Sequence, residues 1–525
     1  MPGPVDWPTR DLLAHRASTT PDATAVIDAD AGESRTYGEF DRRVDAVTER
    51  LETVVYGPDD RLDRPARLGV LMDTRIAFAE VYFAAMRRGV TVVPLNVRET
   101  AAELESKVRR TDLDAIVCEA ETEGLAIEIA DRPIVSVDET ERAGVDSLRS
   151  STAGTADAES VSLERDRTHL LMFTSGTSGE PKIVRLTLGN LVSSANASAF
   201  RLGVTPDDRW LCCLPMYHMG GLAPVVRSTL YGTTVVVQRS FDPEATARVI
   251  DEYDVTGVSL VPTMCKRLLD AGWSPPDSLR FVLLGGAPAT SELLERCRAA
   301  GVPVYPTYGM TETASQIATA TPGETATHEG TVGRPLVCTD VTVVDEAGDP
   351  LPARESGELV VSGPTVTPGY LSDAETEAAF GEHGLHTGDI GYRDEGGRLW
   401  ILNRRSDRIV TGGENVDPGE VLAALRSHPA VDEAAVVGLE DPEWGERVAA
   451  LIVPAAGAAS GDASVTDALA LESLLAHCDE RLAGFKRPKT IGTAAALPRT
   501  ASGTVDRAAV RERLLEDGID ATELR

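Results

Sequence analysis

The chain has 525 residues, of which 42% are hydrophobic and 26% charged, enough for two or more globular domains. Its 83 acidic and 51 basic residues give a net charge of −32, which argues against binding to nucleic-acid phosphates or anionic membranes. No apolar run approaches the roughly 18 residues of a membrane span. The first ten residues lack the apolar core of a secretion signal. We therefore expect a cytoplasmic protein without integral membrane association.

Lysine is rare in this chain. Only five of the 51 basic residues are lysines, namely Lys107, Lys182, Lys266, Lys486 and Lys489. An acidic, lysine-poor surface is typical of proteins from salt-loving organisms, where salt screens the repulsion between like charges. Compositional drift in a GC-rich genome would give the same pattern, and both explanations stay open.

Seven cysteines are scattered along the chain without a C-x-x-C pair: Cys118, Cys212, Cys213, Cys265, Cys297, Cys338 and Cys478. The odd number and the spacing argue against a disulfide framework and against a cysteine-ligated metal. We expect all seven to be small apolar residues of the core.

Apolar strands alternate with amphipathic helices through most of the first 320 residues, which predicts an α/β fold. Residues 68–71 read as a strand, residues 76–86 as a helix that ends at Gly89, and residues 90–95 as the next strand. Such a βαβ unit implies parallel strands. Further strands are predicted at residues 210–214, 233–237, 258–261 and 281–284, and further helices at residues 225–230 and 245–253.

The texture of the sequence changes along the rest of the chain. Residues 139–163 are polar and small, and we expect a surface loop there. Short strands such as residues 341–345 and 357–361 predict a β-rich subdomain. A second change near Arg404 marks the start of a compact α+β region, which contains a loop at residues 455–463.

Residues 173–182, Phe-Thr-Ser-Gly-Thr-Ser-Gly-Glu-Pro-Lys, follow the apolar strand predicted at residues 169–172. Backbone N–H groups and hydroxyls can gather around a polyanion here, because glycine permits a close approach. Lys182 can reach the outer phosphates as a point charge. The spacing differs from the Walker pattern, since Glu180 and Pro181 separate the last glycine from the lysine. A flexible surface loop is the alternative, which the strand before it and the Pro-Lys ending disfavour.

Three further stretches have the same chemical character. Residues 308–313, Tyr-Gly-Met-Thr-Glu-Thr, offer a hydroxyl and a carboxylate for a phosphate and its Mg²⁺. Residues 386–389, His-Thr-Gly-Asp, place a carboxylate in a turn, and residues 404–415 join arginines to a glycine-rich loop. Each alone fits an ordinary turn. Their order along the chain is what favours a shared site.

Together these motifs strongly resemble the superfamily of adenylate-forming enzymes, which includes acyl-CoA synthetases, beetle luciferases and nonribosomal peptide adenylation domains. The resemblance extends over residues 7–510. It implies an α/β fold, with a large N-terminal adenylation domain (residues 1–404) of α/β subdomains plus a β subdomain. A small mobile α+β C-terminal domain (residues 405–525) would follow. The implied chemistry joins a small-molecule carboxylate to ATP with Mg²⁺, and then transfers the acyl group from acyl-AMP to the thiol of coenzyme A.

The resemblance also implies roles for particular residues. The nucleotide-binding residues would be Thr174, Ser175, Gly176, Thr177, Gly179, Lys182, Gly285, Gly286, Ala287, Pro288, Tyr308, Gly309, Thr311, Asp389, Arg404, Gly412 and Gly413. Among them, Lys182 would bind the β- and γ-phosphates, Thr311 the α-phosphate, and Asp389 with Arg404 the ribose. Glu312 would hold the metal, which neutralises the charge that develops when a carboxylate attacks a triphosphate. His218 matches a histidine beside the reacting carboxylate; a histidine packed in the core is the alternative.

One branch of the superfamily matches best, the o-succinylbenzoate–CoA ligases of menaquinone biosynthesis, on residues 226–236, 311–317, and 406–409 with 412–416. Its substrate has a second carboxylate, which needs a cation deep in the acyl pocket. Arg227 is our candidate for this cation; a helix cap or a solvent-facing side chain is the alternative. His218, Gly286, Ser315 and Gln316 complete the expected acyl pocket.

The C-terminal region departs from the family at one position. The family pattern ends in Gly-Lys, and that lysine bridges the carboxylate and the nucleotide, but Thr504 stands here. Loss of such a contact can cost about 10²–10³ in rate. Three explanations stay open. Lys486, Lys489 or Arg507 takes the place of the missing lysine, the branch works with a weaker adenylation step, or the change traps the enzyme.

The family's C-terminal domain turns about a hinge between the two half-reactions, and Ser406 occupies the hinge position. The turn would bring the loop of Gly412 and Gly413 to the acyl-AMP. The rival functions are a CoA ligase for another aryl or medium-chain acid, and an adenylation-impaired or binding protein. A luciferase-like oxygenase shares the fold alone. The sequence leaves open whether identical chains form a homo-oligomer.

Overall fold

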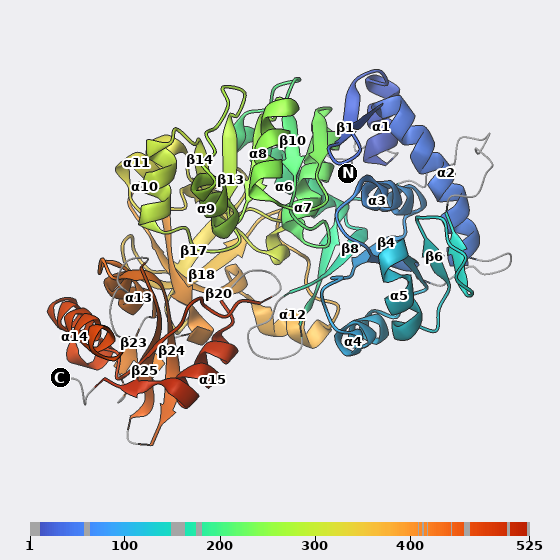
Figure 1. Ribbon diagram of the computed structural model, residues 1–525. Coiled ribbons are helices and arrows are strands. Elements are labelled where there is room, and N and C mark those ends of the chain that lie inside the picture. Colours follow the sequence, from blue (N-terminus) through green and yellow to red (C-terminus); the bar gives the residue numbers. More distant parts are fainter. Residues whose placement is uncertain are drawn as a thin grey trace. The chain divides into compact units, whose positions relative to one another are not determined.

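The computed structural model describes residues 11–56, 64–148, 163–174, 181–407, 409–411, 414–416, 418–442, 444–455, 463–500 and 505–521. The chain divides into two compact units (Figure 1). The first unit comprises Met1–Val341, Val361–Leu385 and Gly397–Leu399, and the second comprises Thr342–Val360, His386–Gly396 and Trp400–Arg525. The domain boundary expected between residues 404 and 405 stays a prediction.

The first unit contains a nine-stranded sheet with the order β16-β15-β14-β13-β12-β10-β11-β1-β2. The run from β14 to β1 is parallel, as the alternating sequence pattern predicts. Its strands β11, β12 and β13 are buried along their whole length, because helices cover both faces of such a sheet. The strands are β1 (Thr24–Asp28), β2 (Glu33–Thr36), β10 (Arg209–Cys212), β11 (Thr234–Val237), β12 (Gly257–Leu260), β13 (Phe281–Leu284), β14 (Val304–Tyr308), β15 (Ala318–Thr319) and β16 (Arg334–Pro335).

A second sheet of the first unit has the order β7-β6-β5-β3-β4-β8-β9, in which only β9 is antiparallel to its neighbour. Its strands are β3 (Arg67–Leu71), β4 (Thr91–Pro94), β5 (Ala115–Cys118), β6 (Ile134–Ser136), β7 (Val145–Ser147), β8 (Thr168–Phe173) and β9 (Ile183–Thr187). Strand β7 corrects the loop expected at residues 139–163. This short edge strand carries too few apolar residues to show a pattern, and residues 149–162 lie outside the described chain.

The helices of the first unit are α1 (Leu12–Thr19), α2 (Tyr37–Tyr56), α3 (Ile76–Arg88), α4 (Ala101–Thr111), η1 (Ala120–Thr122), α5 (Glu123–Ile129), α6 (Leu188–Leu202), α7 (Met219–Tyr231), α8 (Pro243–Glu252), α9 (Pro262–Asp270), α10 (Ser291–Ala299), η2 (Thr311–Thr313), α11 (Pro322–Thr327) and α12 (Asp373–Ala379). Helix α3 is buried nearly all round and ends at Gly89, whose φ of 64° is left-handed, as predicted. One apolar core joins α2, α3 and α7 to both sheets. No helix in the described ranges is long and apolar enough to cross a membrane.

A five-stranded sheet confirms the β-rich region predicted after the α/β part. It has the order β17-β18-β20-β19, with β21 beside β20. Its strands are β17 (Asp340–Val344), β18 (Gly357–Ser362), β19 (Phe380–Gly381), β20 (Gly384–Arg393) and β21 (Leu399–Arg404).

The C-terminal part of the second unit is α+β, as predicted. Its six-stranded sheet has the order β23-β22-β25-β26-β27, with β24 beside β25. The elements are η3 (Arg405–Asp407), β22 (Ile409–Thr411), β23 (Glu414–Val416), α13 (Pro418–Arg426), β24 (Val431–Asp441), β25 (Gly445–Pro454), α14 (Ala463–Arg481), η4 (Gly484–Lys486), β26 (Thr490–Thr493), α15 (Arg507–Asp517) and β27 (Ile519–Asp520). Most of the loop predicted at residues 455–463 lies outside the described residues.

All seven cysteines are free, and six of them are buried, as expected. Cys338 is the exception, because it is exposed with a φ of 63° in the turn between β16 and β17. Cys265 and Cys297 are buried neighbours on α9 and α10, with their sulfur atoms 3.5 Å apart.

Candidate functional site

Three predicted site segments leave the nine-stranded sheet at one edge. Residues 213–218 follow β10, residues 285–288 follow β13, and residues 309–316 follow β14. Because these strands are parallel, their carboxyl ends lie on the same side of the sheet. Ligands of open α/β sheets bind at this edge. The structure therefore brings His218, the glycine pair and the Thr-Glu box to one edge, as the predicted site requires.

Two glycines at this edge are required by the backbone. Gly286 has a φ of 79°, which side chains rarely tolerate. A Cβ on Gly309 would lie 1.7 Å from the carbonyl oxygen of Ser315, so only glycine fits there. Gly285 and Gly286 follow β13, and the half-buried Tyr308 ends the neighbouring strand β14. Ala287 and Pro288 continue this segment, and the nucleotide roles of all these residues stay predictions.

Glu312 has the surroundings expected of a metal ligand. Its side chain is buried, within the short helix η2 that follows β14. One carboxylate oxygen, Oε1, accepts a hydrogen bond from the hydroxyl of Tyr370 at 3.0 Å. The carboxylate oxygens of Glu312 are the hard ligands that Mg²⁺ prefers, so the residues fit this ion. Thr311, on the same turn, is half-buried.

The base of the phosphate loop is a strand pair. Strands β8 and β9 run antiparallel, and the N–H of Thr174 donates to the carbonyl of Lys182 at 3.0 Å. The ammonium of Lys182 lies 4.7 Å from the ring centroid of Tyr370. Ser175, Gly176, Thr177 and Gly179 lie outside the described residues, so their contacts with phosphate stay predictions.

Two functional candidates escaped sequence reasoning. Tyr370 contacts both Lys182 and Glu312, although 58 residues separate it from Glu312 and no sequence pattern links them. Lys107, on α4, is buried, pairs with Glu99, and lies 4.5 Å from the ring centroid of Phe173, where the phosphate loop begins. The only sequence feature that distinguishes Lys107 is the rarity of lysine in this arginine-rich chain.

His218 stands at the first turn of α7 and is half-buried. Burial, with smaller contributions from the charges of Lys107 and Arg98, lowers the pKa of His218 to about 4. The imidazole is therefore neutral near pH 7, and it can accept or donate a hydrogen bond beside a carboxylate without adding a charge. Its ring packs edge-on against Tyr217, with centroids 4.9 Å apart.

Arg227 lies within α7 and is only 2% exposed, which excludes the solvent-facing alternative. Its guanidinium carbon is 5.4 Å from the ring centroid of Trp210. Within the part of the chain that the structure describes, the buried Nη2 atom has no hydrogen-bond partner, and burial lowers the pKa of the group. The helix is capped by Gly232 rather than by Arg227. A buried guanidinium in this state is suited to an anionic ligand.

The other expected acyl-pocket residues lie after η2. Ser315 has a φ of 120°, in a region that few side chains adopt, which marks a strained turn. Gln316 is buried, and its Nε2 donates to the hydroxyl of Thr319 at 2.7 Å, while its Oε1 has no partner among the residues that the structure describes. Contact of either residue with a substrate stays a prediction.

Asp389 and Arg404 belong to the second unit, where the structure pairs them. The Nε of Arg404 lies 3.0 Å from the buried carboxylate of Asp389. This agrees with a shared role at a ribose, which stays a prediction. Ser406 lies in the next turn, η3, whereas Gly412 and Gly413 lie outside the described residues, so the proposed loop movement stays a prediction.

The three residues considered as replacements for the family lysine have other partners within the second unit. Lys486 forms an ion pair with Glu420 at 2.6 Å, and Arg507 forms one with Asp407. The ammonium of Lys489 lies 4.1 Å from the ring centroid of Trp444. Thr504 itself lies outside the described residues.

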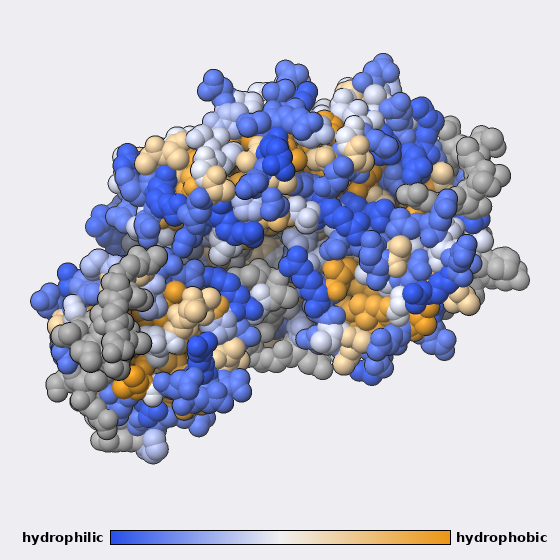
Figure 2. Space-filling view, viewed as in Figure 1, coloured by the Kyte–Doolittle hydropathy of each residue, from blue (hydrophilic) through white to orange (hydrophobic). Residues whose placement is uncertain are grey.

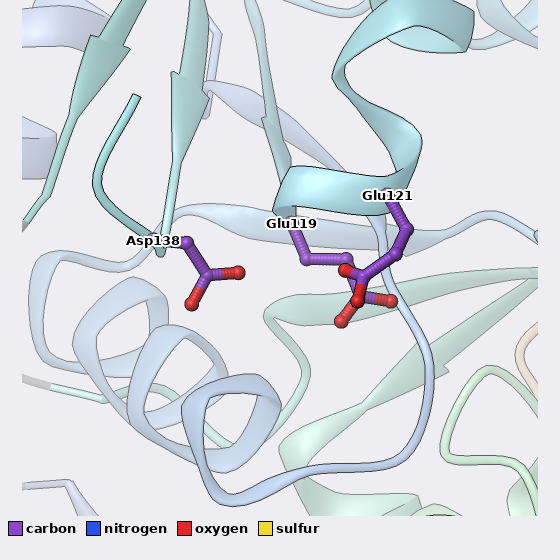
Figure 3. Close-up of side chains that lie close together, drawn as sticks. All are labelled: Glu119, Glu121 and Asp138. Carbon is purple, nitrogen blue, oxygen red and sulfur yellow. The ribbon is translucent and has the colours of Figure 1, made fainter. Parts of the chain in front are cut away.

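A separate group of carboxylates, Glu119, Glu121 and Asp138, follows β5 and β6 (Figure 3). Their oxygens lie within 4.8 Å of one another. Arg75 pairs with Glu119 and Asp138, and Arg239 pairs with Glu119 and Glu121. Because guanidinium groups already compensate this charge, the cluster is an ion-pair network rather than a metal site.

Comparison with known proteins agrees with this geometry. Residues 13–371 match the family model of the AMP-binding enzymes, and residues 420–504 match the model of the AMP-binding enzyme C-terminal domain. A 2-succinylbenzoate–CoA ligase of Bacillus mycoides is 37% identical over 96% of this chain and 98% of its own length. The corresponding ligase of Geobacillus kaustophilus is 38% identical over 93% of this chain and 95% of its own length.

Solved structures give the same result. The o-succinylbenzoate CoA synthetase of Bacillus subtilis in complex with the acyl-adenylate intermediate OSB-AMP is 34% identical, with a TM-score of 0.84 over 97% of this chain and 99% of that one. Its complex with ATP and a magnesium ion has a TM-score of 0.83 at 34% identity, over 96% and 99% of the two chains. These matches confirm the predicted fold of a large N-terminal and a smaller C-terminal domain. The chain therefore belongs to the family of AMP-binding enzymes.

Proposed function

We propose that this protein is an ATP-dependent acid–thiol ligase that makes o-succinylbenzoyl-CoA for menaquinone biosynthesis. A carboxylate oxygen of o-succinylbenzoate attacks the α-phosphorus of ATP, which gives acyl-AMP and releases pyrophosphate. The thiolate of coenzyme A then attacks the acyl carbon, which gives the thioester and releases AMP. The observation that carries the proposal is the similarity to 2-succinylbenzoate–CoA ligases along nearly the whole chain.

The first unit supplies the groups for the first half-reaction. Lys182, with the hydroxyls of the phosphate loop, binds the outer phosphates, and Thr311 binds the α-phosphate. Glu312 would hold Mg²⁺, which when bound would neutralise charge on the phosphates. Neutral His218 orients the attacking carboxylate without changing the charge of the site. Preorganised donors of this type stabilise the charge that develops in the transition state.

Arg227 supports the choice of acid. The second carboxylate of o-succinylbenzoate can pair with the buried guanidinium, whose Nη2 has no hydrogen-bond partner among the described residues. A simple aryl or alkyl acid would leave that charge unpaired, which costs binding energy. Arg227 therefore favours binding of o-succinylbenzoate over benzoate or octanoate.

The second unit supplies the ribose-contacting pair and the moving part. Asp389 and Arg404 bind the ribose, and the chain beyond residue 404 turns about Ser406 between the half-reactions. The excess of acidic residues supports the proposal that the enzyme operates in the cytoplasm of a cell with high internal salt.

The test of this proposal is a panel of acids. Pyrophosphate release and thioester formation are measured with o-succinylbenzoate, benzoate, 2-hydroxybenzoate, hexanoate and octanoate in high salt. We expect the highest kcat/KM for o-succinylbenzoate. A higher value for benzoate or octanoate would show that the enzyme is a CoA ligase for another acid.

Thr504 favours a second candidate, an enzyme with an impaired first step. Thr504→Lys restores the charge that the family pattern carries, so we expect it to raise the adenylation rate up to about 10²-fold. Thioester formation from supplied acyl-AMP should change little. Thr500→Lys, four residues earlier, is the matched control for an added charge. No gain in adenylation would show that another group already supplies the cation.

A further inference from the structure

The segment before α12 connects the two phosphate-handling parts of the first unit. Tyr370 forms an antiparallel bridge with Val184 on β9, the strand that begins directly after Lys182. At its other end, the N–H of Thr367 donates to the carbonyl of Glu312 at 2.7 Å. The backbone of this segment is therefore bonded both to the strand that follows the phosphate loop and to η2.

The side chain of Tyr370 makes the same connection. Its hydroxyl donates to Oε1 of Glu312 at 3.0 Å, and its ring lies 4.7 Å from the ammonium of Lys182. Tyr370 is only 3% exposed. In this hydrogen bond the phenol O–H donates and the carboxylate accepts.

We infer that Tyr370 is a positioning residue. Its hydroxyl orients the carboxylate of the metal ligand Glu312, and its ring positions the ammonium of the phosphate-binding Lys182. The inference rests on the proposed roles of Glu312 and Lys182 and adds the residue that couples them. A hydrogen bond to one carboxylate oxygen fixes the rotation of the carboxylate, as partners of metal ligands do. The ring holds the ammonium over its face and leaves its positive charge intact for the phosphates.

Two substitutions separate these contacts. Tyr370→Phe removes only the hydroxyl, whereas Tyr370→Leu also removes the aromatic face. Mn²⁺ affinity in the presence of a nonhydrolysable ATP analogue is measured by electron paramagnetic resonance. Affinity for the same analogue without metal is measured by calorimetry in excess chelator. Neither measurement needs the acid or coenzyme A, so the result does not depend on which acid is the substrate.

We expect Tyr370→Phe to weaken Mn²⁺ binding by about 10–100-fold and to change metal-free nucleotide binding by less than about twofold. Tyr370→Leu should weaken Mn²⁺ binding equally and also weaken metal-free nucleotide binding by about 3–10-fold, the range of a cation–π contact. Tyr392→Phe is the matched control, since Tyr392 stacks on Trp400 in the second unit.

Two results would overturn the inference. One is unchanged Mn²⁺ affinity in Tyr370→Phe, and the other is an equal loss of metal-free nucleotide binding in both variants, which would indicate a purely structural role. A double-mutant cycle keeps the test valid if Tyr370→Phe lowers stability. In the background of Glu312→Gln, Tyr370→Phe should then have no further effect on Mn²⁺ binding, and a full additional loss would contradict the inference.

Discussion

Two buried arginines of the first unit have opposite surroundings. Arg87 is 1% exposed and forms ion pairs with Asp11, Asp41 and Asp45, which raise its pKa although burial alone would lower it. Arg227 is 2% exposed, with an aromatic ring beside it and an Nη2 atom that no described residue hydrogen-bonds. An uncompensated buried charge costs several kcal/mol. Its place in the core is best explained by an anionic group that arrives with the substrate.

Arg227→Leu tests this explanation by separating binding from stability. We expect kcat/KM for o-succinylbenzoate to fall about 10–100-fold, the range of a charge-assisted hydrogen bond, with a smaller loss on benzoate. The melting temperature should rise, because the variant no longer buries an unpaired charge. Arg227→Lys is the control that keeps a charge. An equal loss on both acids, with lower stability, would show that Arg227 is structural.

His169 on β8 predicts how stability depends on pH. His169 is 5% exposed, its Nε2 has no hydrogen-bond partner in the described ranges of the chain, and burial lowers its pKa to about 3. In the unfolded chain the imidazole has a pKa near 6.5 and binds a proton first as the pH falls. The stability that this residue contributes is therefore complete above about pH 6.5 and is lost progressively toward pH 3.

We expect His169→Leu to remove about 3 kcal/mol of the stability that the protein loses between pH 7 and pH 4. Urea unfolding at the two pH values measures this difference. The matched control is His15→Leu, because His15 is exposed on α1. The same pH dependence in His169→Leu and the parent protein would refute the role of His169.

At the scale of elements, the short helix η3 is held by ion pairs on both sides of Ser406. Before it, Arg404 pairs with Asp389 at 3.0 Å, and Arg405 pairs with Glu358 at 2.9 Å. After it, Asp407 pairs with Arg507, the first residue of α15. The Arg404 pair ties the end of β21 to β20, the Arg405 pair ties η3 to β18, and the Asp407 pair ties η3 to α15. The predicted hinge residue, Ser406, therefore lies between the arginines that pair with the strands and the aspartate that pairs with α15.

Asp407→Asn should slow complete thioester synthesis more than adenylation alone, if the proposed turn at Ser406 takes place between the half-reactions. We expect about a fivefold difference, since a partly exposed ion pair is worth up to about 1 kcal/mol. Rapid-quench measurement of both half-reactions provides the comparison. The charge swap Asp407→Arg with Arg507→Asp should restore the ratio. Equal slowing of both steps, without rescue by the swap, would count against this role.

How much of the fold the sequence predicts depends on the kind of element. Residues 281–284 were predicted as a strand with the bounds that the structure shows, because a buried parallel strand is a continuous apolar run. The polar edge strand β7 gives no such signal and was predicted as a loop. Cys338 was placed in the core on residue type alone, whereas its turn leaves it exposed.

The same distinction applies to the site. Motifs with local spacing led to Glu312, Asp389 and Arg404, and the structure pairs the last two. Tyr370 has no local motif, since its role depends on a segment that is bonded to β9 and η2 from far along the chain. Contacts made by tertiary packing are not encoded in the spacing of neighbouring residues, so only the folded chain reveals them.

At the scale of the whole molecule, the net charge of −32 should govern stability. Hydrophilic residues cover most of the face seen in Figure 2. Mutual repulsion of the surface carboxylates is felt over a Debye length of about 10 Å at 0.1 M salt, but only about 3 Å at 1 M. The folded chain therefore needs salt more than a neutral protein does.

We expect the melting temperature to rise by at least about 3 °C between 0.1 M and 1 M KCl, which corresponds to about 1 kcal/mol in a domain of 150–250 residues. Sucrose at matched osmolality is the control, because it favours compact states without screening charge. A similar rise in sucrose, or no rise in KCl, would show that the acidic composition does not make the stability of the protein depend on salt.

The most direct test of the central claim is a single-turnover reaction with o-succinylbenzoate. The enzyme is mixed with ATP, Mg²⁺ and this acid in high salt, and coenzyme A is added after a delay while mass spectrometry follows the products. The account predicts that o-succinylbenzoyl-AMP and pyrophosphate form first, in amounts up to one per active site. Addition of coenzyme A should then convert the adenylate to o-succinylbenzoyl-CoA and AMP. Absence of the adenylate, or an adenylate that coenzyme A does not consume, would contradict the account.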